Sequence, residues 1–179
     1  MIRCLVLDVD GVLTDGRLWY GLGAEPLRAF HIHDGLAIMC FRQTLGEVVI
    51  LTAKQSEAVR IRADELGIRH VIQGSRDKWA DLERRLPDLG VAAEQIAAMG
   101  DDLPDLAVLR RVGYPMAPAN AVAEVKAAAR FVTTRAGGRG AVREAVEHLM
   151  RQAGQWDSVL SGYDAVALST SEVKRGTAQ

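Results

Sequence analysis

Cysteines, aromatic residues and long apolar runs are scarce in this chain of 179 residues. The two cysteines, Cys4 and Cys40, fall in apolar patterns, which excludes a disulfide framework and predicts two reduced core thiols. Every apolar run is shorter than the roughly 20 residues that a membrane-spanning helix needs. Residues 1–11 become acidic too early for a secretory signal peptide, so we expect a cytoplasmic protein.

An excess of charge of either sign is also absent. Lys and Arg number 22 and Asp and Glu 23, so the formal net charge is −1. Nucleic acids and anionic membranes therefore exert no general attraction on the chain, and electrostatic specificity must be local. The length suits one domain with its own core.

Short apolar runs alternate with amphipathic segments up to residue 153. Strands are predicted at 2–8, 47–53, 69–74, 96–102, 114–117 and 131–134, and helices at 34–46, 56–67, 76–86, 103–113, 120–130 and 140–152. Asp34 and Asn120 are expected as N-caps and Gly46 as a C-cap. The alternation predicts a single doubly wound, Rossmann-like α/β domain over residues 1–153, with a parallel sheet covered on both faces.

Residues 17–33 interrupt this alternation. Two aromatic-bearing runs flank the turn-rich GLGAEP, a pattern that predicts an inserted β-hairpin. Because an isolated hairpin is marginally stable in water, we expect it to pack on another subunit. The periodicity fades after residue 153, so residues 154–179 are predicted to form a mobile tail that docks through Trp156, Leu160 and Tyr163.

Two carboxylates stand close together where the first predicted strand ends, in VLDVDGVLTDG (6–16). Asp8 and Asp10 share one face of an extended chain. Two charges about 4 Å apart repel by roughly 4 kcal/mol at an effective protein dielectric near 20. Some opposite charge must therefore offset the repulsion.

Other polar residues follow the later strands, and parallel strands bring their carboxyl ends to one edge of the sheet. They are Thr52, Lys78, Asp101 and Asp102. Carboxylates gathered at one edge suit a hard cation, above all Mg²⁺, which is commonly held by one or two carboxylates and a substrate phosphate. One Asp then remains free to accept a phosphoryl group as an aspartyl-phosphate.

These motifs resemble those of the haloacid dehalogenase-like phosphatases, in the same order: DVDGVLTDG, a Thr after the second strand, a later Lys, and GDDLPDL. The hairpin, DGLAI, LGI, QGSRDK and RAGGRGAVRE are similar to the sugar-acid branch of that family, so the resemblance covers residues 1–150. It implies a Mg²⁺-dependent phosphatase without a large cap domain. Its substrate would be a 2-keto-3-deoxy sugar-acid phosphate of eight carbons, used in lipopolysaccharide biosynthesis, or a nine-carbon relative.

The resemblance also implies roles for the acidic residues. Asp8 would attack phosphorus, and Asp10 would protonate the leaving oxygen and then activate water. Asp8, Asp101 and the main-chain carbonyl of Asp10 would hold Mg²⁺. Asp102 would support the cluster from outside, whereas Asp105 is expected to be only a charge in the first turn of a helix.

The remaining candidates would contact substrate. Thr52 and Lys78 would bind the phosphoryl oxygens, with Lys54 as the alternative ammonium. The family commonly has Thr-Gly-Arg where this chain reads TAK (52–54), and Arg or Lys where it has His33. Lys54 and His33 would both face the sugar-acid carboxylate. Arg139, in a glycine-rich stretch before a predicted helix, is a secondary anion-binding candidate.

Two other classes of protein share part of this pattern. A signalling receiver domain also combines acidic residues, Thr and Lys, but it places a lone phospho-accepting Asp after the third strand, where this chain has QGSRD. Some relatives keep the fold only as non-catalytic tetramerisation domains of sugar-acid activating proteins. In the family four hairpins form a barrel, which implies a homotetramer through residues 17–33.

Overall fold

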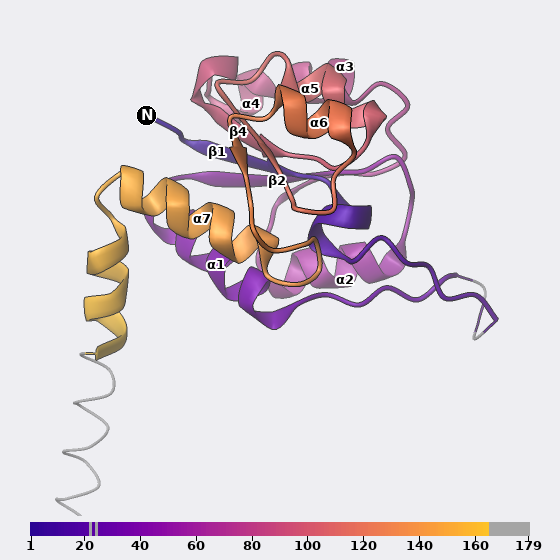
Figure 1. Ribbon diagram of the computed structural model, residues 1–179, viewed down its shortest axis with the longest axis horizontal. Helices are drawn as coiled ribbons and strands as arrows, with labels where there is room; N and C mark the ends of the chain where they lie inside the picture. The colour runs from indigo at the N-terminus through magenta and orange to yellow at the C-terminus, as the bar shows by residue number, and fades with distance from the viewer. Residues whose placement is uncertain (22, 24, 165–179) are drawn as a thin grey trace, which may run out of the picture.

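The structure, a computed structural model, describes residues 1–164 except residues 22 and 24. Its centre is one parallel sheet of six strands in the order β3-β2-β1-β4-β5-β6 (Figure 1). The strands are β1 (Cys4–Leu7), β2 (Glu47–Leu51), β3 (His70–Ile72), β4 (Ile96–Met99), β5 (Tyr114–Ala117) and β6 (Phe131–Val132). All six lie where strands were predicted. The chain starts inside the sheet and builds outward in both directions, which confirms the doubly wound fold.

Helices cover both faces of the sheet (Figure 1). One layer consists of α1 (Ile32–Thr44), α2 (Glu57–Glu65) and α7 (Ala141–Gln152), with α1 and α7 packed together. The other consists of α3 (Lys78–Glu83), α4 (Leu86–Leu89), α5 (Leu106–Leu109) and α6 (Ala123–Ala128). The described residues contain no large cap domain, as the resemblance implies. None of these helices is both long and apolar enough to cross a bilayer.

Three predicted helices are markedly shorter than expected, among them 120–130, which forms α6 over Ala123–Ala128 only. The segment 76–86 ends as α3 at Glu83, and the chain restarts as α4 with Pro87 in its first turn. The segment 103–113 begins with a single 3₁₀ turn, η3 (Leu103–Asp105), which contains Pro104. Proline has no N–H to donate within a helix, so it is tolerated only at a start.

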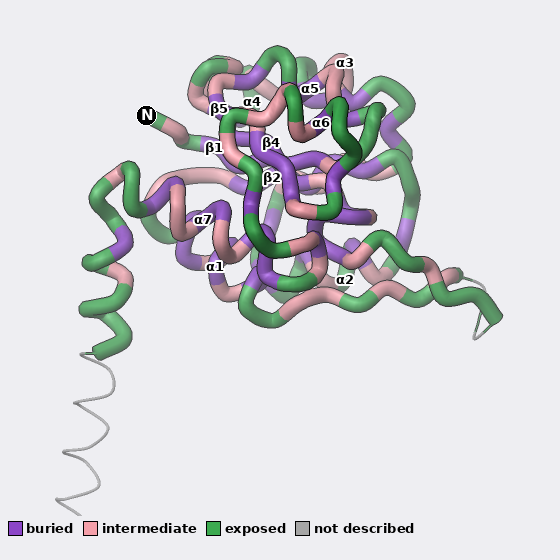
Figure 2. The backbone as a smooth tube through the Cα atoms, in the orientation of Figure 1, coloured by how far each residue is buried: buried purple, intermediate pink, exposed green. Residues whose placement is uncertain are grey.

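Strand residues alternate between two cores. In β1, Leu5 and Leu7 face α1, α2 and α7, whereas Cys4 and Val6 face the opposite helices. All four side chains are at most 2% exposed, and the strands form the buried centre of the molecule (Figure 2). Burial on both faces explains the unbroken apolar run, and each buried Leu contributes about 1.5–3 kcal/mol. The two cysteines are buried and free, as predicted.

Residues 17–33 leave the sheet edge as a long excursion (Figure 1). Within the described part of this segment one antiparallel bridge, between Trp19 and Leu27, joins the outgoing and returning chain. The antiparallel return is confirmed, but the prediction of two regular hairpin strands is wrong. A two-stranded ribbon by itself makes too few contacts to stabilise regular strands.

The three predicted helix caps differ from those in the structure. Helix α6 begins after Val122, so Asn120 is not its N-cap. Helix α1 begins after His31, and Asp34 lies in its first turn. The Asp34 Oδ1 instead accepts the main-chain N–H of Arg143 at 2.7 Å, so this carboxylate caps α7. The C-cap of α1 is Leu45, one residue before Gly46. An acidic residue suits both an N-cap and a first turn, so the pattern alone did not distinguish them.

The chain after α7 is not a loose tail at first. Residues 156–164 are helical, in a segment where the sequence shows no clear periodicity. Trp156 is 5% exposed and packs beneath the guanidinium groups of Arg143 and Arg151, 5.0 and 5.4 Å from its ring centroid. Leu160 and Tyr163 stay about half exposed. Residues 165–179 of the predicted tail lie outside the described residues.

Candidate active site

The first acidic residue follows β1 directly, and the chain then turns sharply in η1 (Val9–Leu13). The turn is closed by the Thr14 N–H, which donates to the Val9 carbonyl at 3.0 Å. Gly11 has φ +95°, a conformation that favours glycine, and a Cβ there would lie 1.9 Å from Asp101 Oδ2. The glycine therefore lets the acidic residue after β4 approach the turn after β1.

Lys78 joins two carboxylates at the start of α3. Its Nζ lies 2.9 Å from Asp8 Oδ1 and 2.6 Å from Asp105 Oδ1, and its side chain is 6% exposed. Burial lowers the pKa of Lys78, but the charges of Asp8 and Asp105 outweigh burial and raise that pKa above its ordinary value. Lys78 is therefore a fixed positive charge between two acidic groups. The sequence analysis expected Lys78 to bind phosphoryl oxygens and named neither carboxylate as its partner.

Asp105 was expected to be only a charge in the first turn of a helix, but in the structure it binds Lys78 and two main-chain N–H groups. Its carboxylate is buried, and Oδ2 accepts the main-chain N–H groups of Asp101 at 2.9 Å and Asp102 at 3.2 Å. Gly100 leaves room for this, since a Cβ there would lie 2.3 Å from Asp105 Cβ. Asp105 therefore fixes the loop after β4 and orients Lys78.

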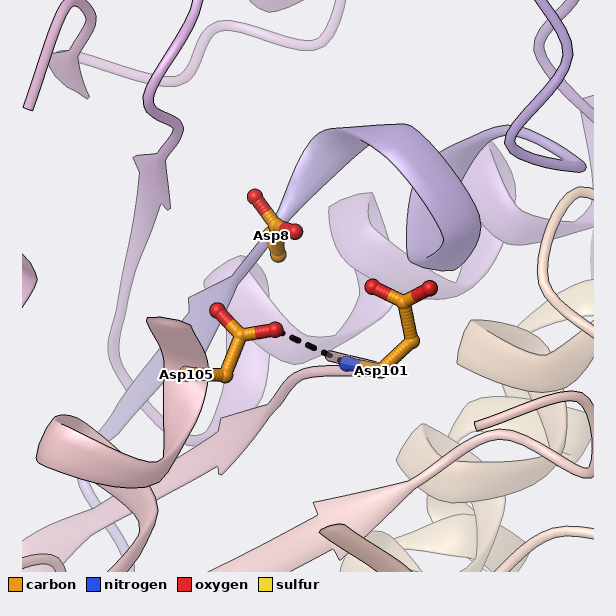
Figure 3. A group of neighbouring side chains, drawn as sticks. All are labelled: Asp8, Asp101 and Asp105. Atoms are coloured by element: carbon orange, nitrogen blue, oxygen red, sulfur yellow. Dashed lines mark hydrogen bonds between the residues drawn. The ribbon is translucent and has the colours of Figure 1, made fainter. Parts of the chain in front are cut away.

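Three carboxylates converge at this point (Figure 3). Asp8, Asp101 and Asp105 each offer an oxygen within 4.8 Å of the others. Burial, followed by the charge of Asp105, raises the pKa of Asp8 to about 6. Burial and then the charge of Asp8 raise the pKa of Asp101 to about 7. Buried and partly buried carboxylate oxygens that repel one another in this way are suited to a divalent cation.

Not all of these oxygens are free for a metal ion. Both Asp105 oxygens are already occupied by Lys78 and main-chain N–H groups. Asp8 Oδ1 faces Lys78, and the remaining oxygens belong to Asp8 and Asp101. The donor set that fits a cation is therefore Asp8 with Asp101, while Asp105 supports both.

A cleft of about 290 Å³ opens beside the cluster. Its wall includes Asp10, Thr52 and Lys54 together with the groups already described. Thr52 follows β2 and is buried, and its Oγ1 accepts the N–H of Lys54 at 3.3 Å. A cleft of this volume is at the small end of the range for ligand sites, about 300–1,000 Å³. Its charged lining suits a small phosphorylated molecule.

Asp10 has a partner that the sequence analysis missed. Arg28, from the excursion 17–33, binds both carboxylate oxygens of Asp10, with Nε at 2.8 Å from Oδ1 and Nη2 at 3.2 Å from Oδ2. The two residues are 18 positions apart, and a lone Arg in an inserted segment carries no periodic signal. The one signal in the sequence was that Asp10, an acidic residue with no predicted partner, lies close to the insertion 17–33.

The remaining candidates lie farther out. His33 is exposed and stacks edge-on with His31. Arg139 is 66% exposed and 3.6 Å from Asp15. Asp102 is exposed, lines the cleft and accepts the N–H of Leu103 at 2.8 Å. Asp105 thus provides the support to the cluster that was expected from Asp102.

The glycine-rich loop 135–140 packs on the η1 turn. Asn120, predicted as a helix cap, joins them: Nδ2 donates to the Gly11 carbonyl at 3.1 Å and Oδ1 accepts from the Gly137 N–H at 2.6 Å. A Cβ on Gly137 would lie 1.8 Å from the Gly11 carbonyl oxygen. This contact explains why glycine is needed in the loop, which holds the active-site turn in place.

Comparison with known proteins agrees with this geometry. A model of the haloacid dehalogenase-like hydrolase family matches residues 43–145. The chain is 42% identical over 156 residues to 3-deoxy-D-manno-octulosonate 8-phosphate phosphatase KdsC of Escherichia coli K12, a match that covers 87% of this chain and 83% of that protein.

Two solved structures of similar proteins contain metal ions. The 3-deoxy-D-manno-octulosonate 8-phosphate phosphatase of Moraxella catarrhalis, in complex with magnesium, phosphate and KDO, is 35% identical with a TM-score of 0.87, covering 90% of this chain and 93% of that one. The cobalt-bound enzyme of Haemophilus influenzae is 35% identical with a TM-score of 0.83, covering 87% and 91%.

The paired strand-end carboxylates, the buried lysine and these similarities exclude the receiver-domain alternative. They also argue against a purely structural tetramerisation domain, because the acidic residues, Thr52 and Lys78 all line one cleft. The chain belongs to the haloacid dehalogenase-like hydrolase family and is a phosphomonoester hydrolase.

Proposed function

We propose that this enzyme hydrolyses a 2-keto-3-deoxy sugar-acid phosphate, 3-deoxy-D-manno-octulosonate 8-phosphate or a close relative, in cytoplasmic lipopolysaccharide biosynthesis. The observation that carries the proposal is the Lys78-linked carboxylate cluster in a small charged cleft. The substrate class is taken from the phosphatases of Escherichia coli and Moraxella catarrhalis, whose names specify that substrate.

In the first step Asp8 attacks phosphorus. Lys78 holds one oxygen of this carboxylate at 2.9 Å, which orients the group toward the cleft. A bond forms between an Asp8 oxygen and phosphorus as the bond to the sugar oxygen breaks. Asp10 gives its proton to that leaving oxygen, so the sugar departs as a neutral alcohol and Asp8 carries the phosphoryl group.

In the second step water attacks the phosphoryl group on Asp8. Asp10, now a carboxylate, takes a proton from this water as the oxygen–phosphorus bond to Asp8 breaks. Phosphate leaves, and both Asp8 and Asp10 return to their starting states. Thr52 and Lys78 bind the phosphoryl oxygens through both steps, and such positioning and charge neutralisation are what phosphoryl transfer mainly requires.

The donor set of this site fits Mg²⁺. Asp8 and Asp101 would hold the ion with the main-chain carbonyl of Asp10, since carboxylate and carbonyl oxygens are the ligands it prefers. Bound there, Mg²⁺ would neutralise charge on the transferring phosphoryl oxygens. Without it, burial and then the neighbouring negative charges raise the pKa values of Asp8 and Asp101.

Fewer residues are available to recognise the sugar acid than to bind the phosphoryl group. Lys54 lines the cleft and is exposed, so it can meet a substrate carboxylate as a point charge. It does not offer the planar fork of an arginine, and a nine-carbon keto-sugar phosphate therefore stays a second candidate substrate. His33 and Arg139, both exposed, stay secondary candidates for substrate binding.

A phosphate-release screen over six- to nine-carbon sugar phosphates, each with and without Mg²⁺, tests the proposed function. We expect turnover confined to 2-keto acids and dependent on Mg²⁺, because the site combines a metal donor set with a free ammonium group. Equal activity on simple hexose phosphates would contradict the proposed substrate class.

The crowded carboxylates predict how Mg²⁺ and pH affect stability. Unfolded carboxyl groups titrate near 3.8, whereas in the folded, metal-free protein the pKa values are about 6 for Asp8 and about 7 for Asp101. Between these values the folded state holds more protons than the unfolded state. The metal-free melting temperature should therefore fall as pH rises from 4 to 7, by linkage.

Mg²⁺ binds the ionised groups, so it should stabilise the protein more at pH 8 than at pH 5. A concentration of about 100 times Kd adds about 2.7 kcal/mol, or roughly 5–10 °C for a chain of this size. Thermal melts of Asp101→Asn should lose this increment, while those of Asp88→Asn, an exposed carboxylate on α4, should keep it. An equal Mg²⁺ effect at both pH values would sink the explanation.

We propose that the chain forms a homotetramer through residues 17–33. Trp19, Tyr20 and Leu27 are 60%, 75% and 50% exposed on this excursion, and covering such apolar area favours association. Light scattering should give a mass about four times the 19.4 kDa chain, reduced by the double change Trp19→Ser and Tyr20→Ser. A mass of one chain for the wild type would reject the assembly.

A further inference from the structure

The excursion 17–33 reaches the active site through one buried side chain. The Arg28 side chain is 2% exposed, although its segment is largely exposed. It binds both oxygens of Asp10, in the two-pronged arrangement that matches a planar guanidinium to a carboxylate. Arg28 is absent from the cleft wall, whereas Asp10 is part of it. The guanidinium therefore holds Asp10 from behind and leaves the approach to substrate open.

The third nitrogen of the guanidinium is anchored as well. Nη1 donates to the Oγ of Ser56 at 3.1 Å. Ser56 is the buried N-cap residue of α2, yet its hydroxyl makes no capping hydrogen bond to that helix. Its own N–H is held by Gln73 Oε1 at 2.6 Å. Ser56 is thus fixed in place and gives up a usual capping contact to support Arg28.

We propose that Arg28 is a positioning residue that sets the orientation of Asp10 for proton transfer to the leaving sugar oxygen. The inference rests on the proposed function, which makes Asp10 the proton donor. Among the described residues, Arg28 supplies both side-chain hydrogen bonds to the Asp10 carboxylate. A carboxylate on a turn can rotate about its bonds, and a two-pronged partner removes that freedom.

The two hydrogen bonds from Arg28 to Asp10 differ in length. Oδ1 is held by Nε at 2.8 Å, and Oδ2 is held by Nη2 at 3.2 Å. We assign the transferred proton to Oδ2, the oxygen with the longer contact. Oδ2 passes this proton to the sugar oxygen as the phosphorus–oxygen bond breaks, and later receives one from the attacking water. The bond from Nε to Oδ1 persists throughout.

A comparison of two substrates separates this role from a structural one. A sugar alkoxide is a strong base and needs a proton to leave, whereas nitrophenolate from p-nitrophenyl phosphate leaves without one. Misplacing a proton donor by about 1 Å costs about 10–100-fold, so Arg28→Met should lower kcat/KM on the sugar phosphate by that factor and on p-nitrophenyl phosphate by less than about two-fold. The quantity compared is kcat/KM because it reports the steps up to phosphorylation of Asp8 and excludes the later attack of water, which both substrates share. Asp10→Asn should show the same selective loss, and more strongly.

Two further variants make the experiment decisive. Arg17→Met removes an exposed arginine from the same excursion and should leave both activities unchanged. Arg28→Lys keeps the charge but offers no planar fork, so it should fold normally and lower kcat/KM on the sugar phosphate to an intermediate degree. If Arg28→Met fails to fold, Arg28→Lys decides the question by the same ratio of the two activities.

Equal loss on both substrates in Arg28→Lys would overturn the proposal, because it would show damage to phosphoryl binding or to the fold. Unchanged activity on both substrates would overturn it too. The contrast can be measured with any alkyl phosphate that the enzyme cleaves. Failure of the proposed substrate class would therefore appear in the substrate screen, and failure of the Arg28 inference in the ratio.

Discussion

The ammonium group of Lys78, held between the carboxylates of Asp8 and Asp105, is the contact on which the site depends. It joins the ends of β1 and β4 to the start of α3, and it offsets part of the repulsion in the acidic cluster. Burial and then the remaining negative charge raise the pKa values of Asp8 and Asp101, and that charge favours a divalent cation. The same arrangement leaves oxygens of Asp8 and Asp101 that suit a divalent cation, and it holds in place the carboxylate that we propose as the nucleophile.

The sheet makes this contact geometrically simple. Strand β1 lies between β2 and β4, so the residues that follow these strands meet at one edge. Glycines at positions 11 and 100 allow main-chain segments and carboxylates to approach more closely than a Cβ would permit. Asn120 then ties the η1 turn to the loop that precedes α7. These residues place the active-site segments and take no part in the reaction themselves.

The sequence predicts the features that follow a periodic pattern or a known motif. It does not predict contacts between two side chains that are far apart in the chain. Apolar periodicity located all six strands, and the strand-end residues Asp8, Thr52 and Asp101 were placed at one cleft. The Arg28–Asp10 pair and the second role of Asp105 depend on side-chain packing that no local pattern encodes. The cap of α7 by Asp34 joins residues 109 positions apart and was missed for the same reason.

The central claim is that Asp8 accepts the phosphoryl group while Lys78 and a divalent ion hold the surrounding charges. Phosphate release by Asp8→Asn tests it most directly, because the amide keeps the size of the side chain and removes the nucleophilic oxygen. The account predicts a folded protein whose kcat falls by more than about 10³-fold, as for the loss of other enzymatic nucleophiles. Turnover within a few fold of the wild type would contradict it.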